Sequence, residues 1–235
     1  MPGIDPNKLK IESAGFEIRY PQAFQLWDRS GIIWSEAKKR WPGLKLTQIQ
    51  PNSGAFLLDS QFDLQAQLEK SHVVGNRGHK TEKLIDVAAT FTDLVVRTLE
   101  IDEFSRIGLR LVWTQEFPSK EEASAAVFAT KRMQPLSGKH FNIEGVPLYP
   151  DYVFRWETDV LGVTARLRAQ GEKVDFDPPI NFPDVAPIHL ERFRVHVDVD
   201  YYTLGITSVG QLKCKDWIEQ AHRLINRDLH VLIGQ

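Results

Sequence analysis

The stretch FSRIGLRLVW, residues 104–113, decides how the fold of this chain is read. Its residues alternate with a period of two, which is the pattern of a strand that buries one face. Arg106 and Arg110 lie on one side, and the other side is apolar: Ile107, Leu109, Leu111 and Trp113. Burying an unpaired arginine is unfavourable, whereas each buried leucine or tryptophan contributes roughly 1.5–3 kcal/mol. We therefore expect the apolar row to face the core.

Strand and helix patterns surround this stretch in the first half of the chain. Alternating residues predict strands over 16–20, 44–49, 54–59 and 62–74. Stripes with helical spacing predict helices over 21–41 and 79–101, with Gly31 as a point where the first helix bends or splits. The order of these elements is that of a ferredoxin-like split βαβ sandwich.

The second half repeats this theme after a proline-bearing segment. Residues 152–158 and 162–170 predict a hairpin, 192–202 a strand, and 211–233 a final amphipathic helix. We predict a first α+β module over 1–133, a linker over 134–150 and a second α+β module over 151–235. The fold class is α+β, with largely antiparallel sheets backed by amphipathic helices. Two packed ferredoxin-like modules and one continuous sheet both fit this pattern.

Composition narrows the class of protein. A formal net charge of −2 lacks the positive field of a general nucleic-acid binder, so nucleic acid is a disfavoured partner. Cys214 is the single cysteine, which leaves no internal disulfide and fits a reducing compartment. The start of the chain has no apolar signal segment, and no later run is long enough to span a bilayer. We expect a cytoplasmic protein with no membrane contact.

The segment Arg106-Ile107-Gly108-Leu109-Arg110 also carries a family resemblance. It resembles the Arg-Ile-Gly-Leu-Arg strand of a sporadically distributed family of bacterial proteins, and DVDYYT (198–203) with the helix after it resembles that family's closing region. The family has no settled activity and no agreed catalytic residues, so the resemblance assigns no role to any residue. Its patchy distribution implies an accessory role such as phage defence.

The arginine-bearing strand faces are the first candidate site. Arg106, Arg110, Arg192 and Arg194 would bind phosphate if they converged, because guanidinium groups pair with phosphate oxygens. However, carboxylates alternate onto the same faces, among them Glu17, Asp198 and Asp200. We therefore favour a sheet face on which these arginines are ion-paired.

The segment HVDVD, residues 196–200, is the second candidate. His196, Asp198 and Asp200 share one strand face at about 6.6–7 Å spacing, and such side chains can hold a divalent metal. Arg192 and Arg194 on the same face would oppose a cation. We expect no cofactor, with a divalent metal as the alternative.

The third candidate is the proline-bearing segment 175–189, an extended acidic and aromatic strip that contains Phe176 and Phe182. Such a strip can dock on another subunit or lie over its own core. With no convincing catalytic set and six tryptophans, the sequence favours a non-catalytic binding or assembly protein that acts through protein partners or as a homo-oligomer. The competing hypothesis is a metal-dependent protein that processes nucleotides or nucleic acid, centred on His196, Asp198 and Asp200.

Overall fold

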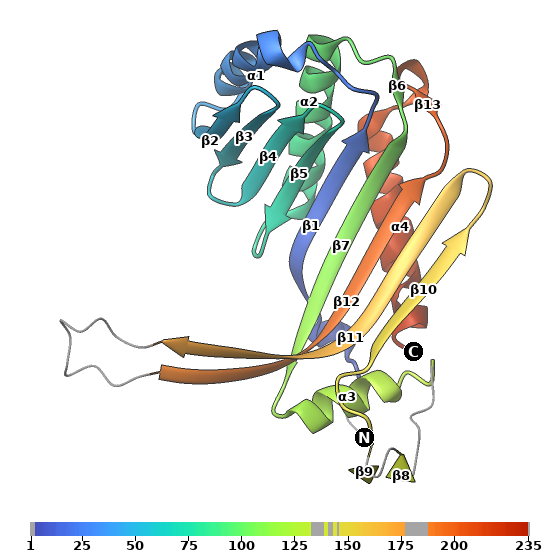
Figure 1. Ribbon diagram of the computed structural model, residues 1–235. Helices are drawn as coiled ribbons and strands as arrows, with labels where there is room; N and C mark the ends of the chain where they lie inside the picture. Colours follow the sequence, from blue (N-terminus) through green and yellow to red (C-terminus); the bar gives the residue numbers. More distant parts are fainter. Residues whose placement is uncertain (1–2, 133–138, 141–142, 145, 177–187, 235) are drawn as a thin grey trace, which may run out of the picture.

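The computed structural model describes residues 3–132, 139–140, 143–144, 146–176 and 188–234 (Figure 1). Within them, nine strands form one antiparallel sheet in the order β10-β11-β12-β7-β1-β5-β4-β3-β2. The strands of this sheet are β1 (Lys10–Arg19), β2 (Lys45–Gln50), β3 (Ser53–Leu58), β4 (Phe62–Gln67), β5 (Lys70–Asn76), β7 (Arg106–Phe117), β10 (Asp151–Glu157), β11 (Leu161–Phe176) and β12 (Ile188–Thr203). Two short pairs lie outside it: β6 (Glu103–Phe104) with β13 (Thr207–Ser208), and β8 (Lys139–His140) with β9 (Ile143–Glu144).

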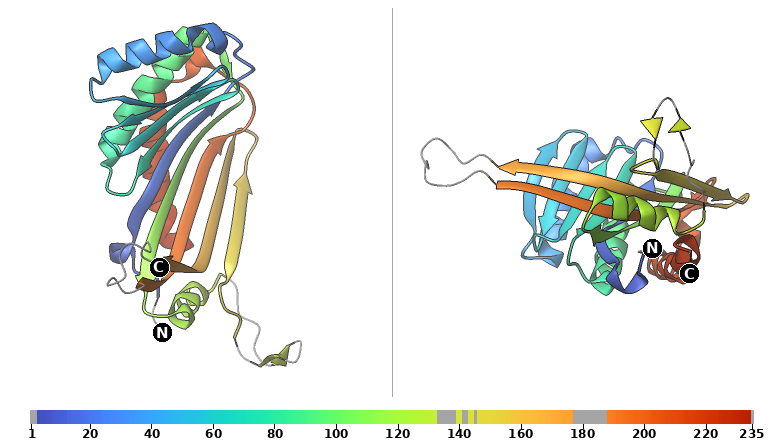
Figure 2. Two further views of the ribbon diagram at one scale, coloured as in Figure 1. Left: turned by 60° about the vertical axis from the view of Figure 1, so that its left-hand side comes forward. Right: turned by 90° about the horizontal axis from the view of Figure 1, so that it is seen from below.

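Helices back this sheet on one face. They are α1 (Leu26–Arg40), α2 (Thr81–Leu99), α3 (Lys120–Phe128) and α4 (Cys214–Leu232), with short 3-10 turns η1 (Pro6–Lys8) and η2 (Val209–Gln211). Helices α1, α2 and α4 lie behind the sheet in Figure 1, and α3 lies near its lower end (Figures 1 and 2). The predicted α+β class, with an antiparallel sheet backed by helices, is therefore confirmed.

The core lies between the sheet and these helices. Strand β7 is central, and its apolar row is buried: Ile107, Leu109, Leu111 and Trp113. The predicted stripe of α2 is buried against the sheet: Leu84, Ala88, Phe91, Val95 and Leu99. Helix α1 begins later than predicted, at Leu26, and runs through Gly31 without a break. Ile33 and Ala37 follow Gly31 and are fully buried, so packing holds the helix together where its propensity is weak.

The single strand predicted over 62–74 is wrong. This segment forms the hairpin of β4 and β5, with a turn at residues 68–69. The buried positions change phase at this turn, from Leu64 and Ala66 in β4 to Ser71 and Val73 in β5. Buried residues on one face of a single strand are an even number of positions apart, so the odd step from Ala66 to Ser71 shows that two strands are present.

The ferredoxin-like modules are not confirmed. Four strands, β2 to β5, lie between α1 and α2, and both predicted modules contribute to one sheet because β12 pairs directly with β7. The two halves nevertheless follow the same plan. Each has a strand, a helix, a meander and a long helix: β1–α1–β2 to β5–α2, then β7–α3–β10 to β12–α4. The meanders extend the sheet in opposite directions from the central β1–β7 pair.

Candidate functional site

The face of the sheet away from the helices carries the predicted arginines. On this face Arg106 of β7 lies between Glu17 of β1 and Asp200 of β12. Its Nη1–H donates to Glu17 Oε1 at 3.0 Å and its Nη2–H to Asp200 Oδ2 at 2.6 Å. The Arg106 side chain is only 19% exposed, so these ion pairs are stronger than those of an open surface.

Two glycines make room for this cluster. The Arg106 guanidinium lies across Gly108, where a Cβ atom would come within 2.7 Å of Nη1. It also stacks on the ring of Tyr202, 4.8 Å from the ring centroid. The Tyr202 ring in turn lies across Gly162 of β11, where a Cβ would come within 2.5 Å of the ring. The glycine in the Arg-Ile-Gly-Leu-Arg segment therefore has a packing reason: a side chain at position 108 would displace the Arg106 guanidinium from this place.

Arg110 is ion-paired on the same face. Its Nε–H and Nη2–H donate to the two oxygens of Asp198 at 2.8 and 2.6 Å, which is a bidentate pair. On the outer strands Arg166 makes the same kind of pair with Asp151. The expected ion-paired face is thus present around Arg106 and Arg110.

Arg192 and Arg194 do not join that cluster. Arg192 is exposed, whereas Arg194 is buried, and its Nη atoms lie 3.5 Å from carboxylate oxygens of Glu116 and Glu172. The Arg194 Nε–H has no hydrogen-bond partner within the described chain. The four predicted arginines therefore form two separate groups. Arg106 and Arg110 lie on β7, each paired with carboxylates of neighbouring strands, and Arg192 and Arg194 lie in the first half of β12.

Burial and neighbouring cations together shift the pKa values of the titratable groups on this face. Burial raises the pKa of Asp200 above its ordinary value, although Arg106 opposes the shift. Burial also raises the pKa of Glu17, but Arg19, Arg106 and Lys70 outweigh it, so this pKa lies below its ordinary value. Burial lowers the pKa of His196, and Arg168 and Arg194 lower it further, so this imidazole is neutral near pH 7.

The predicted metal ligands do not assemble. His196, Asp198 and Asp200 do share one face of β12, as the strand period requires. However, arginines occupy the two carboxylates, Arg110 on Asp198 and Arg106 on Asp200. In the described ranges, no group of three or more His, Cys, Asp or Glu side chains is placed to hold a metal ion.

The predicted aromatic strip falls partly outside the structure. Phe176 is the last residue of β11, and residue 188 begins β12, so the two strands are longer than expected and pair to their ends. Phe182 and the rest of 177–187 lie outside the described residues. The binding role of this strip stays a prediction.

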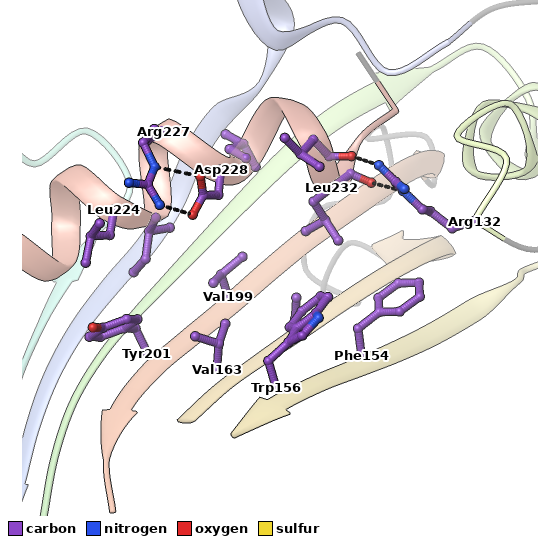
Figure 3. A pocket seen from close by; sticks show the side chains of 14 residues that line it. Arg132, Phe154, Trp156, Val163, Val199, Tyr201, Leu224, Arg227, Asp228 and Leu232 are labelled. Atoms are coloured by element: carbon purple, nitrogen blue, oxygen red, sulfur yellow. Dashed lines mark hydrogen bonds and ion pairs between the residues drawn. The ribbon is translucent and has the colours of Figure 1, made fainter. Parts of the chain in front are cut away.

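An apolar groove lies on the helix side of the sheet, between α4 and the strands β10, β11 and β12 (Figure 3). It has a volume of about 640 Å³. Its sheet side includes Phe154, Trp156, Val163 and Tyr201, and its helix side includes Leu224 and Leu232. The rings of Phe154 and Trp156 stack at 5.9 Å, and Trp156 is 54% exposed. These residues give the groove an apolar lining with an exposed tryptophan, a composition that occurs in the core of protein interfaces.

The charged residues of the groove are engaged with one another or with the backbone. Arg227 and Asp228 form a bidentate ion pair with N···O distances of 2.7 and 2.8 Å. The guanidinium of Arg132 donates to the carbonyl oxygens of Val231 and Leu232 at the end of α4. These charged groups are therefore satisfied within the protein, and most of the other lining residues are apolar, so the groove is suited to binding apolar groups.

Sequence reasoning missed this groove. The alternation of Tyr152, Phe154 and Trp156 in β10 was a usable signal, because it predicts an apolar face on that strand. What it could not indicate is that no described helix covers the helix side of this strand, since that depends on where α3 and α4 pack.

Comparison with known proteins finds no matching family model and no curated protein of significant similarity. The resemblance of the Arg-Ile-Gly-Leu-Arg segment to a bacterial family therefore stays a prediction. Among the helices of the described residues, none has both the length and the apolar content needed to cross a membrane.

Proposed function

We propose that the protein is a non-catalytic binding and assembly protein, which holds the apolar face of a partner protein's helix in the groove beside α4. The observation that carries the proposal is the groove itself: an apolar groove with a volume of about 640 Å³ and stacked, partly exposed aromatic rings. The charged side chains at its margin are already paired, so they do not require a charged ligand.

The two halves of the chain support a helix as the occupant. In the first half, α1 packs beside α2 and over β3, and it buries Leu26, Ile33 and Ala37. By chain order and sheet position, α4 corresponds to α2, and β10 corresponds to β3. The place of α1 in the second half is therefore the space beside α4 and over β10, which is the groove.

Helix α3 does not fill this space. It has 9 residues where α1 has 15, and it packs on β7, β11 and β12 near the lower end of the sheet. Its ring contact with β10 is between Phe128 and Tyr152, and Tyr152 lies two residues before Phe154 of the groove. A helix from a partner would thus complete the second half in the way that α1 completes the first, with anchors at i, i+3, i+4 and i+7.

The expected affinity is modest. Each large apolar anchor contributes roughly 1.5–3 kcal/mol on burial. Two or three anchors, offset by the entropy lost on association, correspond to a complex in the micromolar range.

The test places a photo-crosslinking amino acid at Trp156 in the protein within its native cells. A matched control carries the same group at Ile49 on the opposite edge strand β2, which is similarly exposed (48% against 54%). We expect a protein adduct from position 156 alone, with the linked residues on the apolar face of a helix in the partner. Leu224→Asp should remove this adduct, because it places a carboxylate in the groove, whereas Ile32→Asp on the exposed side of α1 should not. Labelling equal to that of the control, an adduct on an extended segment, or a bound lipid or metabolite would contradict the proposal.

A further inference from the structure

The edge strand β10 has a free backbone side. Within the described residues it pairs only with β11, in an unbroken register from Asp151–Arg168 to Glu157–Gly162. At the two ends of this pair, the Ala169 N–H donates to the Pro150 carbonyl and the Thr158 N–H donates to the Leu161 carbonyl. Because backbone groups alternate in direction along an antiparallel strand, even-numbered residues of β10 point their N–H and C=O groups toward β11. Asp151, Val153 and Arg155 therefore point theirs outward.

The other edge of the sheet is protected, and β10 is not. Strand β2 has a register shift between Leu46 and Gln48, and it begins with Lys45; bulges and lysines are devices that prevent edge-to-edge pairing. Strand β10 is regular and has no lysine or proline. At its centre Val153 is 58% exposed. An apolar side chain on an unprotected, regular edge is the feature that permits a further strand to pair.

We propose that two copies of this chain pair through β10, antiparallel, with Val153 on the two-fold axis. In this register Asp151 of each copy lies opposite Arg155 of the other, on the open face of the sheet. On the helix face, Tyr152 of each copy lies opposite Phe154 of the other. The outward backbone groups of Asp151, Val153 and Arg155 then meet their counterparts as hydrogen-bonded pairs, and opposite charges and aromatic rings are the favourable cross-strand partners.

The symmetric registers with the axis at Phe154 or Arg155 are disfavoured by charge. Moving the axis to Phe154 places Asp151 opposite Glu157, and moving it to Arg155 places two Arg155 side chains opposite each other. Like charges directly opposite destabilise a strand pair. With the axis at Tyr152, Asp151 lies opposite Val153 and gains no opposite charge. Among these registers only that of Val153 pairs opposite charges, so charge complementarity favours it and makes a second copy the occupant of this edge.

This pairing does not depend on the partner proposed for the groove. On the helix face, it would place the apolar side chains of the two β10 strands side by side. The grooves of the two copies would then lie next to each other on one continuous sheet. If the groove binds no partner helix, the two β10 strands can still pair. If the protein is monomeric, the groove can still bind a helix. The crosslinking and sedimentation experiments therefore test the two proposals independently.

The test is a charge exchange followed by sedimentation velocity on the full chain. We expect the parent protein to pass from monomer to dimer with concentration between about 1 µM and about 1 mM. Asp151→Arg and Arg155→Asp alone each place like charges opposite, and should raise the dissociation constant roughly tenfold or more. An equimolar mixture of the two variants restores opposite charges and should form a heterodimer at the parent's affinity. Lys45→Asp on β2 is the control and should leave association unchanged.

A proline at the axis gives a second, independent measurement. Val153→Pro removes an N–H that points away from β11, so the folded monomer should retain its circular dichroism while dimerisation is lost. A parent protein that stays monomeric up to about 1 mM would overturn the proposal, as would a dimer that is insensitive to Val153→Pro or a mixture that fails to associate.

Discussion

Arg106 links three neighbouring strands, so its removal should lower the free energy of unfolding of the protein. It joins β7 to β1 through Glu17 and to β12 through Asp200, and its side chain is 19% exposed. Replacing Arg106 by methionine keeps an unbranched chain over Gly108 but removes the charge. Glu17 retains Arg19 and Lys70 as neighbours, whereas Asp200, which is 28% exposed, loses its ion-pair partner.

The expected loss of stability lies between two reference cases. Exposed ion pairs contribute about 0–1 kcal/mol, and breaking a fully buried pair costs about 3–5 kcal/mol. For the partly buried Arg106, we expect Arg106→Met to lower the free energy of unfolding by about 2–3 kcal/mol near pH 7. In a chain of this length, such a change lowers Tm by roughly 4–12 °C.

The loss should depend on pH in a defined direction. Without Arg106, burial raises the pKa of Asp200 further above its ordinary value. The folded state then binds a proton that the unfolded chain releases near pH 4, so ionisation of Asp200 destabilises the variant as pH rises. The difference in stability between parent and variant should therefore shrink as pH falls from about 7 toward about 4.5.

The measurement is urea unfolding followed by tryptophan fluorescence and circular dichroism. Arg97→Met is the matched control, because Arg97 pairs with Asp93 on the surface of α2 and is 72% exposed; we expect a loss below about 0.5 kcal/mol. In a double-mutant cycle, Arg106→Met with Asp200→Asn should show a coupling energy of about 1–2 kcal/mol. If Arg106→Met is no more destabilising than Arg97→Met, or if the cycle gives no coupling, the reasoning about this cluster is wrong.

Three further predictions concern packing, reactivity and pH. Gly162→Ala should displace the Tyr202 ring, because the new methyl group would lie within 2.5 Å of it, and we expect a loss of about 1–3 kcal/mol in urea unfolding; an unchanged midpoint would argue against the ring position. Burial raises the pKa of Cys214 to about 12, so iodoacetamide should label it slowly at pH 8 in the folded protein and rapidly in urea; equal rates would refute this. Because burial lowers the pKa of His196, the unfolded state binds the extra proton below about pH 6.5 and stability falls there; His196→Gln should flatten this dependence between pH 7 and 5, and an unchanged slope would count against it.

Much of the secondary structure was readable from local pattern. The alternation around Arg106 predicted correctly which side of β7 is buried, and the spacing in α2 and α4 predicted their apolar faces. The hairpin of β4 and β5 was missed, since a continuous apolar alternation over 62–68 concealed the change of phase at the turn. The ferredoxin-like order was not confirmed for a different reason: it has two strands between its helices, whereas the pattern predicted three and the structure has four.

The candidate site could be predicted only in part. The sequence indicated that arginines and carboxylates share faces, but Arg106 lies 89 residues from Glu17 and 94 from Asp200 along the chain. Strand order decides which of them meet, and no local pattern records that order. The groove depends on how the helices pack. The short α3 packs near the lower end of the sheet, so no described helix covers β10 beside α4.

The sequence by itself determined which side of each regular segment is apolar, because side-chain direction follows from the periods of strand and helix. The tertiary structure alone decided which segments lie beside one another, and with that the Arg106 cluster, the groove and the free edge of β10. The physical reason is that strand pairing and helix docking satisfy backbone groups and apolar surface from distant parts of the chain together, so the outcome belongs to the whole fold and to no single stretch.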